Sequence, residues 1–372
     1  MAIPDIGPAS VRRREHGPFN IAMLAPPWIP IPPPGYGGIE LVVGALCEGL
    51  VRLGHSVTLF AAPGSRSSAT VREVLPRCHP YEIGHSLYEI DHVARVLADI
   101  DDMADQGNPF DILHDHCGFT AVALADRIRI PVVHTLHGPF TVDTSAFYRH
   151  YADQAWLVAI SEAQRATAPP GLRLSGVVPN PIEVSDWPFR PTKEDYVLWV
   201  GRFEHFKGAH RAIAAAREAN VRLLLAGPIQ PGQEAYFQRE IAPHLDGNQV
   251  RYLGEVGGGR KQQLFANARA FLMPISWIEP FGMVMVEAMA CGTPVIAFPQ
   301  GAATEIVQPG LNGFLVDDEE TMAAAIANVG QIDPAACRES VDVRFNPEVV
   351  AAGYEAIYRR VTTSRPATGV AG

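Results

Sequence analysis

Short apolar runs alternate with longer stretches of helical periodicity along most of the chain. This alternation is typical of repeated strand and helix units, in which the helices cross over a sheet of parallel strands. The first unit is the clearest, because the strand-like run Ile21–Leu24 is followed by Ile39–Leu53, where apolar residues recur at three- and four-residue steps. Gly54 follows that stretch as a typical helix stop. The chain is therefore predicted to be α/β throughout.

The remaining predicted strands form two series, separated by a turn-rich stretch. The first series continues with Ser56–Phe60, Ile112–His114, Val132–Thr135, Leu157–Ile160 and Val177–Val178. The second consists of Val197–Val200, Arg222–Leu225, Val250–Tyr252, Ala270–Met273, Pro294–Ala297 and Gly313–Val316. Between them the sequence passes Pro188 and Pro191 with weak periodicity, as expected of a linker.

These patterns predict two successive doubly wound domains. The expected boundaries are a disordered extension over 1–19, a first domain over 20–187, a second over 188–345, a terminal helix over 346–362 and a flexible tail over 363–372. The terminal helix could cross back to the first domain. Ligands of doubly wound sheets bind beyond the carboxyl ends of the strands, so two facing domains would place a site in the cleft between them.

Composition argues against several classes of partner. The 372 residues carry a formal net charge of -10 and have a pI near 5.7, whereas nucleic-acid binding needs clustered Lys and Arg. The five cysteines, which never stand in CxxC spacing, indicate neither a disulfide framework nor a zinc site and fit a reducing cytoplasm. No nucleic acid and no metal or other cofactor is expected.

Membrane insertion is not expected either. No stretch is apolar for the roughly 20 residues that a membrane span needs, and no apolar run follows the basic residues at 12–14 as it would in a signal peptide. A cytoplasmic location is predicted. Peripheral membrane contact stays open, although the acidic balance disfavours an anionic surface.

The segment Trp277–Gly292 has the clearest chemical pattern. Pro280 suits the first turn of a helix, which would then begin near Phe281 and end at Gly292. The free N–H groups at the start of such a helix can bind a phosphate, and Gly282 permits close approach of the backbone. The alternative is a capped core helix with two ordinary surface glutamates, Glu279 and Glu287.

A second candidate element is the loop Gly201–Gly208. Its cations Arg202 and Lys207 could stabilise the negative charge that gathers on a departing nucleoside diphosphate, without a divalent metal. The chain has only two other lysines, Lys193 and Lys261. A lysine in a loop flanked by glycines is therefore more consistent with a functional role than with a solvated surface charge. The alternative is an exposed basic loop.

Two histidines stand at the ends of neighbouring predicted strands, His116 and His137. Either could be a hydrogen-bonded core residue. A metal site formed with His114 and Asp115 is also conceivable. Because successive residues of a strand point to opposite faces, His114 and His116 would share a face only if the strand continues through His116. The acidic run Asp99–Asp102 offers the carboxylates of a metal-dependent transferase, but it fits a solvated helix better because no strand precedes it.

Several of these segments together resemble one known family. The pair Glu279 and Glu287 lies in E-P-F-G-M-V-M-V-E-A-M-A-C-G-T-P-V-I-A, which resembles the E-x7-E signature of retaining glycosyltransferases of family 4, whose fold is GT-B. Gly201–Gly208 resembles the family's G-R-x-x-x-x-K-G element, and Tyr36–Glu40 its glycine-rich loop after the first strand. The loop Gly301–Ile306 and the turn and strand Asn312–Val316 also match.

The resemblance implies a GT-B protein with two Rossmann-like domains facing across a cleft. It implies transfer of a sugar from a nucleotide sugar, with UDP favoured, to a hydroxyl acceptor that is a saccharide, a lipid-linked compound or a small molecule. Retention is implied by the family alone. One departure is Pro181, which follows Pro179-Asn180 where the family usually has glycine and would stiffen the linker.

The resemblance also assigns roles. His116, Glu279, Arg202 and Lys207 would be catalytic, Glu287 would bind ribose, and His137 would contact the sugar or the acceptor. The residues implied in donor binding are Gly37, Gly38, Arg202, Lys207, Glu279, Phe281, Gly282, Met283, Val284 and Glu287.

Two other functions stay open at this stage. A non-hydrolysing sugar-nucleotide epimerase would use a similar scaffold and release UDP only as an intermediate. A catalytically idle sugar-nucleotide-binding subunit would retain the fold, although the joint presence of Arg202, Lys207, Glu279 and Glu287 argues against it.

Overall fold

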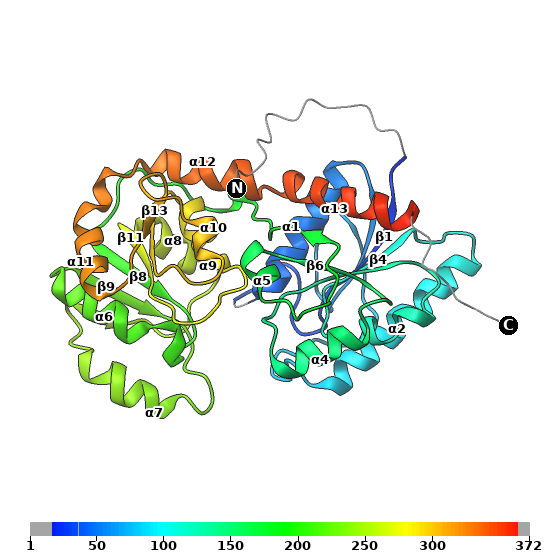
Figure 1. Cartoon of the computed structure of the whole chain (residues 1–372), viewed down its shortest axis with the longest axis horizontal. Helices are drawn as coiled ribbons and strands as arrows, with labels where there is room; N and C mark the ends of the chain where they lie inside the picture. The colour runs from blue at the N-terminus through cyan, green and yellow to red at the C-terminus, as the bar shows by residue number, and fades with distance from the viewer. Residues whose placement is uncertain (1–16, 36, 364–372) are drawn as a thin grey trace.

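The computed structural model describes residues 17–35 and 37–363 and has two lobes, each built around one parallel sheet (Figure 1). Residues 1–16 of the extension predicted over 1–19, residues 364–372 of the tail predicted over 363–372, and Tyr36 lie outside the described residues. Thr363, predicted to begin the tail, is the last residue of the final helix. Phe19 lies inside them, and its N–H donates to Nδ1 of His55 at 3.0 Å. Phe19 is thus an integral part of the first lobe.

Within the described residues, the first sheet has seven strands in the order β3-β2-β1-β4-β5-β6-β7. Their bounds in that order are Thr70–Arg72, Ser56–Phe60, Asn20–Leu24, Ile112–Asp115, Val132–Thr135, Trp156–Ala159 and Gly176–Val177. The second sheet runs β10-β9-β8-β11-β12-β13, with bounds Val250–Tyr252, Arg222–Ala226, Tyr196–Val200, Ala270–Met273, Val295–Ala297 and Gly313–Leu315. All paired strands are parallel, which confirms the predicted fold class.

Every predicted strand is present, with ends within one residue of the prediction, and β3 is the strand that sequence analysis missed. The central strands were readable because both of their faces are buried, so they are almost continuously apolar. In β1, Ile21 and Met23 pack towards helix α1 (Gly38–Arg52), while Ala22 and Leu24 pack towards α2 (Ser86–Asp105) on the other face. Strand β3 is a three-residue edge strand with mostly exposed side chains and carries no such signal.

Helices cover both faces of each sheet. In the first domain they are α1 (Gly38–Arg52), α2 (Ser86–Asp105), α3 (Thr120–Ala123), α4 (Val142–His150) and α5 (Glu162–Ala166). In the second they are α6 (Ala209–Glu218), α7 (Glu234–Tyr236), α8 (Gly258–Asn267), α9 (Met283–Ala290), α10 (Ala303–Ile306), α11 (Glu319–Asn328) and α12 (Pro334–Phe345). The run Asp99–Asp102 lies on α2, where Asp99 pairs with Arg72.

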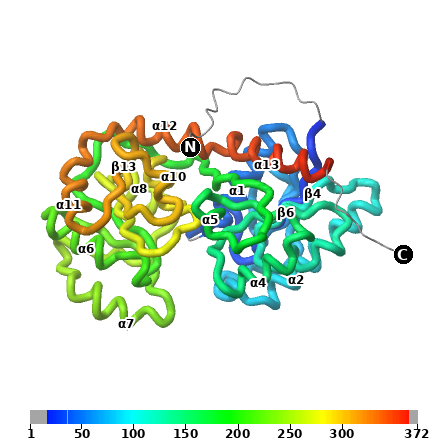
Figure 2. The backbone as a smooth tube through the Cα atoms, in the orientation of Figure 1, coloured from blue at the N-terminus to red at the C-terminus, as the bar shows by residue number. Residues whose placement is uncertain are grey.

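The last helix, α13 (Pro347–Thr363), leaves the second domain and packs on the first. Figures 1 and 2 show α12 running along one lobe and α13 continuing along the other. The buried face of α13 includes Tyr354 and Tyr358 and packs against α1. The two helices approach so closely that a Cβ on Gly49 would lie 2.2 Å from the carbonyl oxygen of Pro347, so only glycine fits there.

A buried polar chain fixes α13 to the first sheet. Nδ1 of His114 lies 2.6 Å from Oη of Tyr358, and its Nε2 lies 2.8 Å from Oγ1 of Thr135, which in turn contacts Oη of Tyr354 at 2.8 Å. All four side chains are buried. Such a network is stabilising only when every member has a partner.

Replacing Tyr358 with Phe should therefore lower the free energy of unfolding by about 1–3 kcal/mol, because a buried ring nitrogen of His114 loses its partner. Urea unfolding followed by far-UV circular dichroism measures the change. Tyr81→Phe is the matched control, since Tyr81 is 96% exposed and its loss should change stability by less than about 0.5 kcal/mol. Equal stability of Tyr358→Phe and wild type would contradict this account of how α13 is anchored.

Candidate active site

In each sheet the strand order reverses at one point, between β1 and β4 in the first sheet and between β8 and β11 in the second. Ligands of doubly wound sheets bind at such switch points. Both switch points here face a common cavity of about 500 Å³ between the domains. The first domain contributes Trp28, Ile29, Gly37, Gly38, Glu40, Ile83 and His137 to the lining. The second contributes Arg202, Lys207, Lys261, Trp277, Glu279, Phe281, Gly282, Met283, Val284 and Glu287.

Helix α9 presents its start to this cavity, but it begins later than predicted. The sequence placed Pro280 in the first turn and the start near Phe281, whereas the first helical residue is Met283 and the N-cap is Gly282. Gly282 has φ 85°, a left-handed conformation that favours glycine and that the Pro280 signal does not reveal. Because no side chain caps the helix, the amides at its start remain available to an anion.

Lys207 and Glu279 form an ion pair on the cavity wall. Nζ of Lys207 lies 2.6 Å from Oε2 of Glu279, which also accepts a hydrogen bond from Nε1 of Trp277 at 3.1 Å. The same ammonium group lies 4.4 Å from the centroid of a Trp277 ring, within cation–π range. Lys207 is therefore held in place before any ligand enters, while Arg202 lines the same cavity, with 39% of its side chain exposed.

Glu287 lies deeper and has a partner that sequence analysis missed. Its Oε2 lies 2.6 Å from Nζ of Lys261, which projects from α8. Only 2% of the Glu287 side chain is exposed, so an unpaired charge there would be costly. The scarcity of lysine was the signal that could have identified Lys261, since the chain has three.

The first domain contributes glycines and one carboxyl group. Gly37 caps α1 and Gly38 begins it, so both lie at a helix start that faces the cavity. Glu40 in the same turn was not singled out from the sequence, yet it lines the cavity and is 5% exposed. Burial raises the pKa of Glu40 to about 7, because desolvation outweighs the hydrogen bond from its own backbone N–H.

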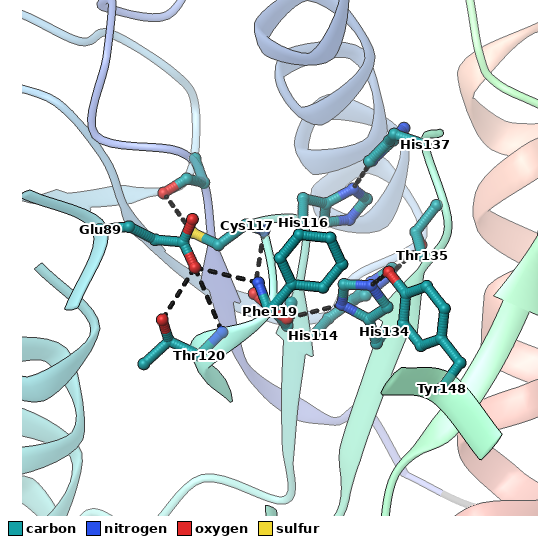
Figure 3. Close-up of polar contacts among 12 residues, drawn as sticks. Glu89, His114, His116, Cys117, Phe119, Thr120, His134, Thr135, His137 and Tyr148 are labelled. Carbon is teal, nitrogen blue, oxygen red and sulfur yellow. Dashed lines mark hydrogen bonds and ion pairs between the residues drawn. The ribbon is translucent and has the colours of Figure 1, made fainter. Parts of the chain in front are cut away.

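His137 lines the cavity, but His116 does not. Nδ1 of His116 lies 2.9 Å from Nε2 of His137, a contact drawn as a dashed line in Figure 3. Strand β4 ends at Asp115, but the N–H of His116 still donates to the carbonyl oxygen of Leu24 at 2.9 Å. The His116 ring is buried against His114, with 4.2 Å between the ring centroids. His116 is fully buried behind the half-buried His137, which lines the cavity, and the predicted contact of His116 with the sugar stays a prediction.

Burial keeps these imidazoles neutral. Desolvation lowers the pKa of His137 to about 3 and places the pKa values of His114 and His116 well below the ordinary range, with neighbouring histidines adding to the effect. Asp115, which could have joined a metal site, instead accepts hydrogen bonds from His134 at 2.6 Å and from the N–H of Cys117 at 2.9 Å. In the described part of the chain, no group of three or more His, Cys, Asp and Glu side chains is arranged to hold a metal ion.

A carboxylate joins the two domains beside the cavity. Glu305 on α10 accepts hydrogen bonds from the N–H groups of Glu162 at 2.9 Å and Ala163 at 2.6 Å, at the start of α5 in the first domain. Arg344 donates to the carbonyl oxygen of Glu305 at 2.6 Å and so holds α10 in place. These hydrogen bonds join α10 of the second domain to the start of α5 in the first.

Each half of the chain matches a known protein family. Residues 36–186 match Glycosyltransferase Family 4 and residues 184–335 match Glycosyl transferases group 1, so that together the matches span most of the chain. The chain is a GT-B glycosyltransferase. The sequence-based identification of a glycosyltransferase is thereby confirmed.

Individual relatives share about a quarter of their residues with this glycosyltransferase. Glycogen synthase of Mycobacterium tuberculosis is 27% identical over 82% of this chain and 85% of its own. Phosphatidyl-myo-inositol mannosyltransferase of Mycolicibacterium smegmatis is 28% identical over 92% and 94% of the two chains. Among solved structures, AviGT4, a glycosyltransferase involved in avilamycin A biosynthesis, has a TM-score of 0.74 at 28% identity and covers 93% of this chain and 99% of that one.

Residues 17–35 and 37–363 contain no helix with the length and apolar character needed to cross a membrane.

Proposed function

We propose that this glycosyltransferase moves a sugar from a nucleoside diphosphate sugar, with UDP as the favoured nucleotide, to a hydroxyl acceptor. The observation that carries the proposal is the shared cavity, which brings Arg202, Lys207 and the start of α9 to the same space as Glu287. Cations and free amides suit a diphosphate, and a buried carboxylate suits ribose hydroxyls. The donor therefore lies mainly against the second domain and the acceptor against the first.

Departure of the nucleoside diphosphate is the step that these groups assist. As the bond between the sugar carbon and the phosphate oxygen breaks, negative charge grows on the diphosphate. Lys207, Arg202 and the amides of Met283 and Val284 lie where they can stabilise that charge without a divalent metal. The departing phosphate can then take the proton of the acceptor hydroxyl, which is the front-face path with retention.

His137 and Glu40 lie on the acceptor side of the cavity. A neutral imidazole can both donate and accept a hydrogen bond, so His137 can orient a hydroxyl of the sugar or acceptor. His116 acts through His137, whose ring it contacts at 2.9 Å. We assign His116 as a positioning residue for His137 in place of a direct contact with the sugar.

The acceptor class stays broad. The two relatives named above are a glycogen synthase and a phosphatidyl-myo-inositol mannosyltransferase, so their names include a saccharide and a lipid. A hydroxyl acceptor of either kind, or a small molecule, is compatible with a first-domain wall that combines Trp28, Ile29 and Ile83 with His137. The cytoplasm is the compartment we propose.

Calorimetric titration with UDP, GDP and ADP, followed by their glucose and mannose conjugates, tests the donor assignment. Incubation of the best donor with glucose, inositol and lipid-linked acceptors, with and without EDTA, then tests transfer. Stoichiometric release of the diphosphate together with a new glycoside whose anomeric configuration matches that of the donor supports the proposal. Binding of none of the nucleotides would overturn it, and loss of transfer in EDTA would overturn the metal-independent step.

Replacing Glu287 with Gln should raise the dissociation constant of the bound nucleoside diphosphate by about 10- to 100-fold, because a charged acceptor of hydrogen bonds is lost. Calorimetry measures the change. Glu194→Gln is a matched control, because Glu194 is exposed and does not line the cavity. Unchanged affinity in Glu287→Gln would remove Glu287 from the ribose site.

A further inference from the structure

A carboxylate of the second domain completes the start of a helix in the first. Ser161 caps α5 by accepting the N–H of Gln164 at 2.9 Å, which leaves the amides of Glu162 and Ala163 without a partner in their own helix. Glu305 accepts from both amides, at 2.9 and 2.6 Å, one with each carboxylate oxygen. Hydrogen bonds to an ionised carboxylate are stronger than neutral ones. We call this contact between Glu305 and α5 the interdomain clasp.

On the first-domain side, the clasp adjoins the segment that carries His137. The Gln164 side chain is buried, and its amide nitrogen donates to the carbonyl oxygens of Leu136 and Gly138 at 2.8 and 2.9 Å. Its Oε1 accepts from the N–H of Ile160 at 2.8 Å. The two carbonyl groups flank His137 in the sequence, so α5 fixes the backbone on both sides of this cavity residue.

On the second-domain side, the turn before α10 is fixed to the backbone of Glu279. The N–H of Ala302 donates to the carbonyl oxygen of Glu279 at 2.9 Å. Gly301 packs so closely that a Cβ there would lie 2.3 Å from the same oxygen. Because the side chain of Glu279 pairs with Lys207 at 2.6 Å, this turn supports the residue that holds Lys207 in place.

We propose that Glu305 is a positioning residue that sets the first-domain half of the active site relative to the second. Its carboxylate joins two short chains of contacts. The first runs through α5 and Gln164 to His137. The second runs through α10 and the backbone of Glu279 to Lys207. Glu305 itself does not line the cavity, and the inference rests on the proposed roles of His137 and Lys207 in sugar transfer.

Sugar transfer needs groups from both domains, whereas nucleotide binding depends mainly on the second. The hydroxyl that His137 orients must lie close to the sugar carbon from which the diphosphate departs, next to Lys207. A displacement of about 1 Å between reacting groups can lower a rate by about 100-fold. The charged groups proposed to bind the nucleotide, Arg202, Lys207 and Glu287, all belong to the second domain. Loss of the clasp should therefore lower turnover and spare nucleotide affinity.

The test compares turnover with nucleotide affinity in Glu305→Ala, using the full chain. With saturating donor and acceptor, kcat per folded molecule should fall by about 10- to 100-fold. The dissociation constant of UDP, measured by calorimetry, should change by less than about 3-fold. Glu305→Gln keeps one accepting oxygen and should lie between Glu305→Ala and wild type. Glu320→Gln is the matched control, because Glu320 is exposed on α11 of the same domain and does not line the cavity.

A double-mutant cycle tests the connection to His137. Gln164→Met removes both donors to the carbonyl groups beside His137 and should lower kcat by about 10-fold without changing the affinity for UDP. Because Glu305 and Gln164 act on the same ring, the double variant should lose much less activity than the product of the two single losses. If Gln164→Met does not fold, a cycle of Glu305→Ala with His137→Ala provides the same comparison.

The possible outcomes separate this role from others. A contact that only stabilises the fold would lower the melting temperature of Glu305→Ala and leave kcat per folded molecule as in wild type, which would overturn the inference. A loss of UDP affinity as large as the loss of kcat would also overturn it, because Glu305 would then act on the donor site alone. Fully multiplicative losses in the cycle would overturn the connection to His137. Failure of wild type to bind UDP, GDP and ADP would instead overturn the proposed function itself.

Discussion

Replacing Lys207 with Met should lower kcat by about 100- to 1,000-fold, the usual effect of removing one preorganised group that stabilises transition-state charge. Lys207 is held 2.6 Å from Glu279 and over Trp277, so it faces the cavity without having to reorganise. The KM for the donor should rise much less, because most of the charge on the diphosphate develops during departure. Initial rates with the best donor and acceptor measure both constants.

The control for this variant is Lys193→Met. Burial lowers the pKa of Lys193 to about 8, and its ammonium donates to the carbonyl oxygens of Ala266 and Cys291 at 2.9 and 3.0 Å. Its loss should lower the melting temperature while leaving kcat per folded molecule unchanged. The Lys207 variant would thus lose catalytic rate, whereas the Lys193 variant would lose stability. Full activity in Lys207→Met would contradict the assignment.

Acid should destabilise this protein steeply just below pH 6.5, because several histidines are buried in the neutral form. Burial lowers the pKa of His92 to about 4 and places those of His114 and His116 well below 6.5. In the unfolded chain these rings bind protons as the pH falls through 6.5, whereas in the folded chain they do not. Each ring therefore removes up to about 1.4 kcal/mol of stability per pH unit between 6.5 and its folded pKa.

One carboxyl group acts in the opposite direction. The pKa of Glu40 is raised from 4.5 to about 7, so the folded protein binds a proton there that the unfolded chain does not, and stability rises as the pH falls from 7 to 4.5. The histidines outnumber it, so the net slope between pH 6.5 and 4.5 should still be a loss on acidification.

Urea unfolding at half-unit steps from pH 7.5 to 4.5 measures this slope. The variant His92→Gln should reduce the slope of unfolding free energy against pH by up to about 1.4 kcal/mol per pH unit, because one titrating ring is removed. Its amide can still donate to the carbonyl oxygen of Ala25, so the hydrogen bond is kept. His150→Gln, at an exposed position, is the matched control. A free energy of unfolding that stays constant between pH 6.5 and 5 would show that the buried rings are not neutral in the folded state.

The fold was predictable from the sequence wherever the apolar residues of a segment are also the residues that are buried in the structure. In central strands such as β1 and β8 nearly every residue is buried, so an uninterrupted apolar run predicts the strand directly. The edge strand β3 buries little and was missed. The start of α9 was placed two residues early, because the left-handed turn at Gly282 is a conformational choice that Pro280 does not encode.

The candidate site was predictable where one short segment carries several of its groups. The segment around Glu279–Glu287 was read correctly as a set that lines one cavity, together with Arg202 and Lys207. Glu40 was quoted as part of a motif but not recognised as a cavity residue, because its burial depends on the facing domain. Lys261 was noticed only as one of three lysines.

By itself the sequence determined the α/β class, nearly all strands, the family resemblance and the residues of the motifs, because these depend on composition and spacing within one segment. Only the tertiary structure decided which side chains meet: Lys261 with Glu287 across α8 and α9, His137 in front of His116, and α13 on the first domain. Such pairings depend on how helices pack against each other and on how the chain turns after a strand ends. Those are long-range packing outcomes, which no local periodicity contains.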